Sequence, residues 1–183
     1  MNTAVTVFFL ILRVFSLYFL AVSLFGLCSR RRPEPAARLR RFAVLIAARN
    51  EESCIAGLIE SLRAQHYPPE LVDIWVLPNN CTDRTAEAAR RAGAQVLEMP
   101  ASVRSKGAAL HTAAKALLRS ARNYDAFCVF DADNEADPAF LSEMNRALDR
   151  TAIVKSRILA KNRTQAGISA CYEIYFCSAN HFL

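Results

Sequence analysis

Two aspartates that stand two positions apart, Asp131 and Asp133, are the residues of this chain best suited to chemistry. They follow a short run, 126–130, whose aromatic and β-branched residues predict a buried strand. Because side chains alternate along a strand, both carboxylates are expected on one side of its carboxyl end. Ligands of open α/β sheets bind there, and two carboxylates can hold a divalent cation that in turn holds a diphosphate. The alternative is a solvated acidic loop.

The elements that must position these carboxylates show an alternation of strand and helix patterns. This rhythm predicts an α/β domain with a mostly parallel sheet flanked by helices. Asn50 or Ser53 is expected to cap the first helix of the domain, and Thr82 the second. We expect strands at 42–48, 71–77, 95–98, 127–130 and 153–159, and helices at 55–62, 83–92, 106–121 and 137–148.

Other nucleotide and metal motifs are missing from the sequence. The first expected strand runs into Ala-Ala-Arg-Asn-Glu-Glu, without the Gly-x-Gly-x-x-Gly of a dinucleotide-binding fold. A Gly-x-x-x-x-Gly-Lys phosphate loop is also missing. None of the six cysteines forms a Cys-x-x-Cys pair, so the spacing of a zinc site is missing and reduced cytosolic thiols are expected.

The amino-terminal segment is almost wholly apolar from Ala4 to Cys28, with Arg13 as its one charge. At 1.5 Å rise per residue this length covers the ~30 Å hydrocarbon core of a bilayer. Arg13 costs about 3 kcal/mol at a helix centre, which the apolar neighbours offset. We therefore expect residues 1–28 to form a single transmembrane anchor. A cleaved signal peptide with its apolar core at 14–27 is one alternative, and a helix lying in the membrane surface is another.

A basic cluster follows this segment and accounts for much of the net charge of +6. We interpret residues 29–41 as a basic juxtamembrane linker. The positive-inside rule then predicts a single-pass membrane protein whose carboxyl-terminal domain lies in the cytoplasm. Nucleic-acid binding would be another use of such a cluster, but its place beside an apolar segment favours a membrane and no nucleic-acid partner. The cluster consists of Arg30, Arg31, Arg32, Arg38, Arg40 and Arg41.

Polar side chains also follow the other expected strands, and in a parallel sheet these turns share one edge. Taken singly, each has a structural explanation as a helix cap, a turn or a solvated side chain. Taken together, they favour a ligand site. The residues are Arg49, Asn50 and Glu51 after the first strand, Asn79, Asn80 and Asp83 after the second, and Asp131 and Asp133 after the fourth.

Four stretches in order resemble the family 2 glycosyltransferases, which have the Rossmann-like GT-A fold. They are 44–52 (Val-Leu-Ile-Ala-Ala-Arg-Asn-Glu-Glu), 78–86 (Pro-Asn-Asn-Cys-Thr-Asp-Arg-Thr-Ala), 106–110 (Lys-Gly-Ala-Ala-Leu) and 130–133 (Phe-Asp-Ala-Asp). The resemblance implies a metal-dependent hexosyltransferase-like enzyme that takes a nucleotide-sugar donor, most often a UDP-sugar, together with Mg²⁺ or Mn²⁺. Family members with an amino-terminal anchor and a cytoplasmic catalytic domain are common.

The resemblance also assigns roles to single residues. Asn79 stands where the family often has an aspartate that contacts the base, so the base preference is open. Asp131 faces the ribose and the metal, and Asp133 coordinates the metal that bridges the diphosphate. The nucleotide-sugar-binding set is Ala48, Arg49, Asn50 and Glu51 around the nucleoside, Asn79 at the base, Lys106 and Gly107 near the nucleotide, and Asp131, with Asp131 and Asp133 as the metal ligands.

An inverting transfer also needs a general base for the acceptor hydroxyl, which the family supplies downstream of the Asp-x-Asp. After Asp149 the only acidic residue is Glu173, which we interpret as a helix-face residue. The only tryptophan of the chain, Trp75, precedes the Asp-x-Asp. We therefore expect residues 42–183 to be an incomplete domain that holds the donor. The alternatives are a catalytically incompetent nucleotide-sugar-binding module, and a soluble α/β phosphate-binding domain unrelated to sugars.

Overall fold

A computed structural model of the protein describes residues 3–28, 36–156 and 158–159. The chain divides into two compact units. One unit consists of Met1–Glu34 together with Lys155–Leu183, and the other is Pro35–Val154. The second unit holds every strand of the described residues, so the candidate site belongs to it.

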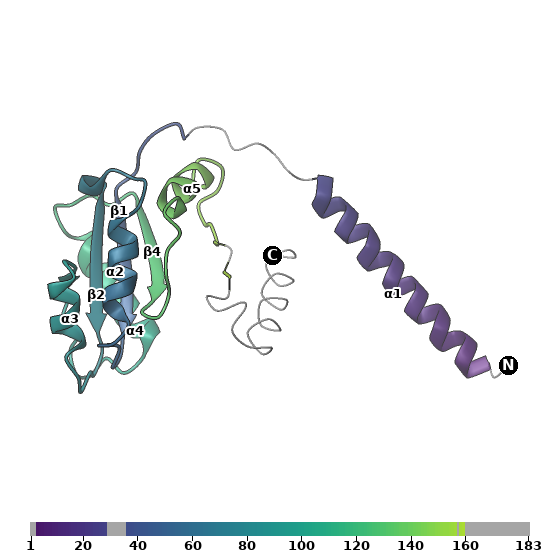
Figure 1. Cartoon of the computed structure of the whole chain (residues 1–183), viewed down its shortest axis with the longest axis horizontal. Helices are drawn as coiled ribbons and strands as arrows, with labels where there is room; N and C mark the ends of the chain where they lie inside the picture. The colour runs from purple at the N-terminus through teal and green to yellow at the C-terminus, as the bar shows by residue number, and fades with distance from the viewer. Residues whose placement is uncertain (1–2, 29–35, 157, 160–183) are drawn as a thin grey trace. The chain divides into compact units, whose positions relative to one another are not determined.

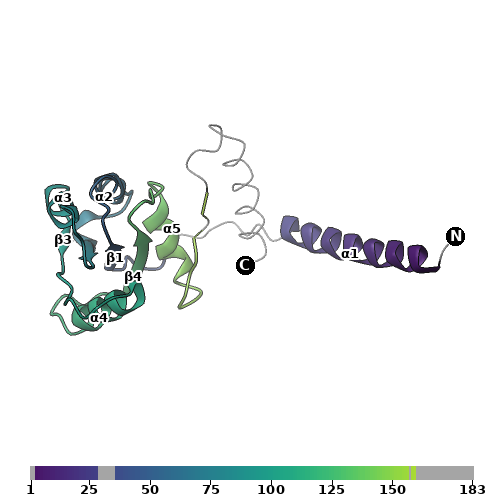
Figure 2. The same ribbon diagram turned by 90° about the horizontal axis from the view of Figure 1, so that it is seen from below.

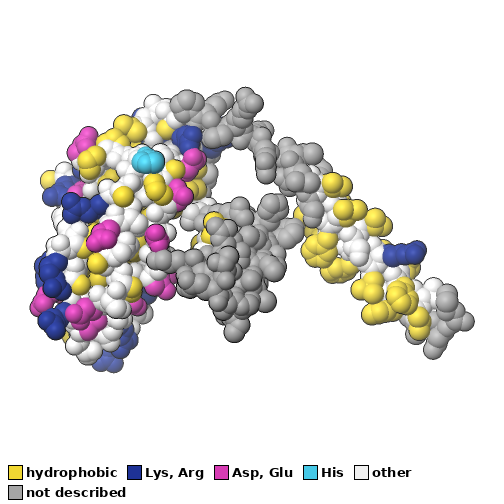
Figure 3. Space-filling model, viewed as in Figure 1, with side chains coloured by type: hydrophobic (Ala, Val, Ile, Leu, Met, Phe, Trp, Pro, Cys, Tyr) yellow, Lys and Arg dark blue, Asp and Glu magenta, His cyan; other side chains and the backbone are white. Residues whose placement is uncertain are grey.

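Helix α1 (Thr3–Cys28) belongs to the first unit and is apolar on all sides. Most of its described hydrophobic side chains are exposed, for example Leu17 at 64%. Figure 3 shows this apolar surface and the basic side chain that interrupts it. Within the described residues it is the one helix long and apolar enough to cross a membrane, through Val5–Val22. A signal sequence would meet the same criteria of length and composition.

The second unit is built on a four-stranded parallel sheet with the order β3-β2-β1-β4, of which Figure 1 labels β2, β1 and β4. Central strand β1 is flanked by β2 on one side and β4 on the other. The predicted α/β fold with a parallel sheet is confirmed. The strands are β1 (Phe42–Ala48), β2 (Val72–Pro78), β3 (Gln95–Val96) and β4 (Ala126–Asp131).

Helices cover both faces of this sheet (Figure 2). Helices α2 and α3 pack against one face, and α4 packs against the other through Ala113 and Leu117. Because β1 lies between the two layers, all of its residues except Ala47 are buried. This burial explains the unbroken apolar run of its sequence. The helices are α2 (Ile55–Arg63), α3 (Thr85–Arg91), α4 (Lys106–Leu118) and α5 (Phe140–Ala147), with a 3₁₀ turn, η1, at Pro69–Leu71.

Three expectations about the β4 side of the sheet do not hold in the structure. Strand β4 was expected to be buried, but it lies at the edge of the described sheet, where Val129 is 52% exposed and only Phe130 is buried. No strand forms in the described residues of 153–159, and Ile153 is 86% exposed. Strand β4 also ends at Asp131, so the alternation that would place Asp133 on the same side does not extend to it.

The segment before β1 is bound to the α/β domain by its arginines. The guanidinium of Arg40 donates hydrogen bonds to the main-chain carbonyls of Asn145 and Leu148 near the end of α5. The main-chain amide of Ala37, together with Arg40, lowers the pKa of the Asp149 carboxyl. Half of the basic cluster is therefore engaged with carboxylates of the domain. The pairs are Arg38 with Asp125 at 3.0 Å, Arg40 with Asp149 at 2.7 Å, and Arg41 with Asp73 at 3.6 Å.

Candidate functional site

The order of the strands creates a switch point between β1 and β4. From β1 the chain moves outward through β2 and β3, and then returns to place β4 on the opposite side of β1. In the register of the sheet, Asp131 lies level with Ala47, one residue before the end of β1. Ligands of open α/β sheets bind outside the carboxyl ends of the strands at such a point, because the two turns diverge there. The turns after β1 and β4 therefore frame the candidate site.

The turn after β1 depends on Asn50, which has a left-handed backbone (φ 58°). Asparagine tolerates this conformation better than most residues with a side chain. Its Oδ1 accepts hydrogen bonds from the amide of Thr82 at 2.8 Å and from the hydroxyl of Thr82 at 3.3 Å. The predicted helix caps were wrong, because Cys54 precedes α2 without a side-chain cap and Arg84, not Thr82, precedes α3.

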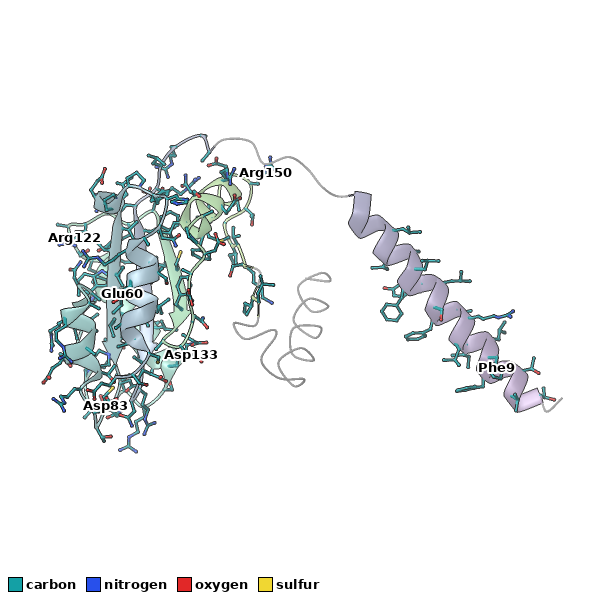
Figure 4. The ribbon with its side chains drawn as sticks, in the orientation of Figure 1. Phe9, Glu60, Asp83, Arg122, Asp133 and Arg150 are labelled. Carbon is teal, nitrogen blue, oxygen red and sulfur yellow. The ribbon has the colours of Figure 1, made fainter. Side chains whose placement is uncertain are left out.

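Further hydrogen bonds join the turns after β1 and β2. The amide of Glu51 donates to the buried hydroxyl of Thr85 at 2.9 Å, and the amide of Glu52 donates to Asp83 Oδ2 at 3.1 Å. The Thr85 hydroxyl in turn donates to Asp83, which lowers the pKa of that carboxyl. The two turns are thus held as one unit. Figure 4 shows Asp83 and Asp133 at the same end of the sheet, away from Arg122.

Ala48 and Asn79 are buried residues at this edge of the sheet. The carbonyl of Ala48 accepts a hydrogen bond from the amide of Asn79 at 2.9 Å, and Ala48 is only 2% exposed. Asn79 is 7% exposed, and its Oδ1 accepts from Asn80 at 2.8 Å. Asn80 also donates to the carbonyl of Val103 at 2.8 Å, which ties the loop before α4 to the turn after β2. The Asn79 amide is therefore both buried and hydrogen-bonded.

The two aspartates have different neighbours. Asp131 forms an ion pair with Lys106, the first residue of α4, and both side chains are exposed. Asp133 lies close enough to Cys54, at the start of α2, to act on its thiol. The pKa of Cys54 is raised to about 11, first by burial, then by the thiol's hydrogen bond to Glu51 and by the charges of Glu51 and Asp133. The carboxylates thus relate to helices on opposite faces of the sheet.

Arg49 and Gly107 leave this edge open. Arg49 is exposed in the turn after β1. Gly107 is the second residue of α4, and a Cβ placed there would meet no atom within 4 Å. No neighbour in the described residues therefore requires a glycine at this position. The missing side chain leaves room for a molecule to approach the start of α4.

The carboxylates suit a metal ion that is shared with a ligand. Among the described residues, no group of three or more His, Cys, Asp or Glu side chains could hold a metal ion alone. Mg²⁺ is commonly bound through one or two carboxylates plus the phosphates of a substrate. Asp131 and Asp133, both exposed at one strand end, supply the kind and number of ligands that this arrangement needs.

A hollow on another side of the domain is not part of the site. A hollow of about 300 Å³ lies beside the start of β2, lined by residues that include Arg63, Tyr67 and Gln95. Its polar groups already have partners, since the Tyr67 hydroxyl donates to the carbonyl of Arg40 at 2.9 Å and Gln95 donates to Asp73 at 3.1 Å. The carboxyl edge is the better candidate because its charges face solvent.

The structure brings all the predicted site residues to the carboxyl edge of the sheet. Sequence reasoning missed two residues of this edge, Thr85 and Cys54. A threonine at the start of a helix gave no sign that its hydroxyl binds the preceding turn. The predicted residues that meet there are Ala48, Arg49, Asn50, Glu51, Asn79, Lys106, Gly107, Asp131 and Asp133.

An open parallel sheet with a polar, partly acidic edge at its switch point is typical of α/β proteins that bind a ligand at that edge. Within that class, residues 43–175 match the family model described as glycosyl transferase family 2. This match covers more than half of the chain. The chain belongs to glycosyl transferase family 2, as its four sequence motifs predicted.

Two curated proteins with related sequences are also glycosyltransferases or sugar-transferring synthases by name. A probable glycosyltransferase of Bacillus subtilis, YdaM, is 28% identical over 108 residues, 55% of this chain and 24% of that protein. The β-monoglucosyldiacylglycerol synthase of a Nostoc species is 40% identical over 43 residues, 24% of this chain and 9% of that protein. The chain thus spans about a quarter or less of the curated relatives it matches.

A solved structure gives the same fold. The mannosyltransferase PcManGT from Pyrobaculum calidifontis, in complex with GDP-Man and Mn²⁺, matches with a TM-score of 0.61 and 22% identity. The match covers 72% of this chain and 39% of the mannosyltransferase chain. At this identity the likeness shows the GT-A type of fold alone.

Proposed function

We propose that this chain binds a nucleoside-diphosphate sugar, most simply a UDP-sugar, and belongs to an enzyme that transfers the sugar with inversion to an acceptor hydroxyl. The observation that supports this most is the meeting of Asp131 and Asp133 with the turn after β1 at the switch point. The family supports the reaction class. The mannosyltransferase relative was solved with GDP-Man, so GDP-sugars are the second donor class to test.

In this reaction the acceptor oxygen forms a bond to the anomeric carbon from the face opposite the diphosphate. The bond from that carbon to the diphosphate oxygen breaks, and the departing nucleoside diphosphate keeps the electron pair. The proton of the acceptor hydroxyl must pass to a base. Asn50, Glu51 and Asn79 would orient the nucleoside, which fixes where the anomeric carbon lies.

Asp131 and Asp133 would hold Mg²⁺ or Mn²⁺ together with the diphosphate. When bound, such an ion acts as a Lewis acid that stabilises the charge building on the leaving diphosphate. The exposed Lys106 and the open space beside Gly107 would let the diphosphate approach the start of α4. Each of these groups acts on the donor, and none of them on the acceptor.

Calorimetric titration of the full chain in detergent tests donor binding. We expect UDP-sugars or GDP-sugars to bind in the presence of Mn²⁺, and Asp133→Asn to abolish the part of the affinity that depends on Mn²⁺. Asp137→Asn is a matched control, because this carboxylate accepts from the amide of Ala139 at 2.8 Å and serves the start of α5. Equal Mn²⁺-dependent affinity in the wild type and Asp133→Asn would refute the proposed site.

Donor binding without transfer is a second candidate function. It is favoured by the structural use of three carboxylates that follow Asp133: Asp137 binds the Ala139 amide, Glu143 pairs with Arg146, and Asp149 pairs with Arg40. Radiolabelled donor separates the two candidates. Sugar transfer or donor hydrolysis by the chain supports the enzyme, whereas donor binding without either supports a binding module.

We also propose that residues 1–28 anchor the chain, that 29–41 form the linker and that the domain from residue 42 onward lies in the cytoplasm. Three arginines of the cluster pair with the domain, so the orientation proposal rests on Arg30, Arg31 and Arg32. Protease treatment of sealed vesicles that carry an amino-terminal tag tests it. The tag should be protected when the domain is accessible.

A further inference from the structure

The ammonium of Lys106 stands at one of the two carboxylates that would hold a metal ion. Its Nζ pairs with Asp131 Oδ1, which joins the first residue of α4 to the last residue of β4. The two side chains are 48% and 59% exposed. Asp131 therefore has a cationic partner from its own chain before any ligand arrives.

This pair is suited to being exchanged. Exposed ion pairs are weak, because water screens the charges and both side chains lose freedom. The positive end of the helix dipole disfavours a cation in the first turn of a helix. The charge of Asp131 therefore stabilises the ammonium of Lys106 at this position. A lysine side chain has four flexible carbons and can follow a new anionic partner within its reach.

A divalent ion that arrived alone would meet an unfavourable arrangement. To bind Asp131 it would have to displace the ammonium, which would then remain beside a doubly charged cation with no partner. A nucleoside diphosphate changes this balance, because its phosphate oxygens can accept the ammonium while they also bind the metal. The open space at Gly107, the next residue, leaves room for that movement.

We propose that Lys106 is a resident counter-cation that couples metal binding to nucleotide binding. In the free protein its charge neutralises that of Asp131, which lowers the affinity for a metal ion in the absence of nucleotide. When metal and nucleotide bind together, the ammonium moves to the diphosphate. This inference rests on the proposed donor function and concerns the order and cooperativity of binding at that site.

Mn²⁺ binding to the full chain in detergent tests the proposal, with the loss of the free-ion electron paramagnetic resonance signal as the readout. The titration is made with Mn²⁺ alone, with Mn²⁺ and UDP, and with Mn²⁺ and GDP. For the wild type we expect UDP or GDP to tighten Mn²⁺ binding. In Lys106→Met, Mn²⁺ alone should bind tighter by on the order of fivefold, and the gain from nucleotide should shrink by a similar factor, at the lower end of typical coupling between sites.

Two further variants act as controls. Lys115→Met removes the same charge from an exposed position in the last turn of α4, at the other end of the helix from Lys106, and it should leave both affinities unchanged. Lys106→Arg keeps the charge and should keep most of the coupling. Unchanged or weaker binding of Mn²⁺ alone in Lys106→Met, with nucleotide-dependent binding intact in the wild type, overturns the inference and leaves the proposed function standing. A wild-type chain that binds neither Mn²⁺–UDP nor Mn²⁺–GDP overturns both.

Discussion

Asn50 and Thr82 join the first two turns at the carboxyl edge of the sheet, since the Oδ1 of Asn50 accepts both the amide and the hydroxyl of Thr82. The left-handed backbone of Asn50 allows this geometry. The residue that sequence reasoning gave to the nucleoside pocket is therefore also a structural link between the two turns.

Asn50→Ala should destabilise the chain by about 2–3 kcal/mol, because alanine pays about 1–2 kcal/mol for the left-handed backbone and the hydrogen bonds are lost as well. Asn50→Gly should cost less, since glycine accepts this backbone freely. Urea unfolding followed by the fluorescence of Trp75 measures both. Equal losses in the two variants would show that backbone strain plays no part.

Thr85 offers a second test of the joined turns. Its fully buried hydroxyl accepts the Glu51 amide, so Thr85→Val should leave that amide without a partner and cost about 1–3 kcal/mol. Thr85→Ser keeps the hydroxyl and should lose much less. Donor affinity, measured by calorimetry, should fall in Thr85→Val because the turn that carries Asn50 and Glu51 is no longer held. If Thr85→Val is less stable but keeps its affinity for the donor, the hydrogen bond between the two turns is not needed for donor binding.

A substitution at Gly107 should affect donor binding and folding stability in different ways. Gly107→Ala meets no atom of the described protein and should keep or raise stability, by up to about 1 kcal/mol from helix propensity. If the diphosphate approaches α4 there, the same change should weaken donor binding severalfold. Gly57→Ala in α2 is the matched control, because its Cβ also meets nothing within 4 Å. A loss of donor affinity in both variants would point to a general effect of helix stiffness.

The sequence predicted most of the fold because burial leaves a direct pattern. Phe42–Ala48 reads as a strand with both faces covered, and it is one. Strand β4 reads the same way, yet Val129 is exposed, because the pattern reports apolar residues and carries no information on which strand lies at the edge. The partners of Asn50 and Thr85 lie 32 and 34 residues away, so only the folded chain reveals them. The Asp131–Asp133 motif predicted that both carboxylates lie at the carboxyl end of β4, but the strand ends at Asp131 and the two side chains have separate neighbours.

The thiol of Cys54 reports on the carboxylates around it. Burial, the hydrogen bond to Glu51 and the charges of Glu51 and Asp133 raise its pKa from 9.0 to about 11. A raised pKa leaves less reactive thiolate, so at pH 8 the alkylation of Cys54 should be about a hundredfold slower than that of an ordinary thiol. The rate should climb as the pH approaches 11. By the same sign, the folded chain holds this proton longer than the unfolded chain, so stability should fall as the pH rises from 9 towards 11.

Glu51→Gln tests the origin of this shift, because it removes a charge and changes the thiol's hydrogen-bond acceptor. Cys54 should then react faster with iodoacetamide at pH 8, as followed by mass spectrometry of the Cys54 peptide. Glu60→Gln changes a carboxylate on the exposed side of α2 and should leave the rate unchanged. Mn²⁺ with a nucleoside diphosphate should also speed the reaction, since a cation at Asp133 offsets the negative charge acting on the thiol. An unchanged rate in Glu51→Gln would mean that Glu51 does not contribute to the raised pKa of Cys54.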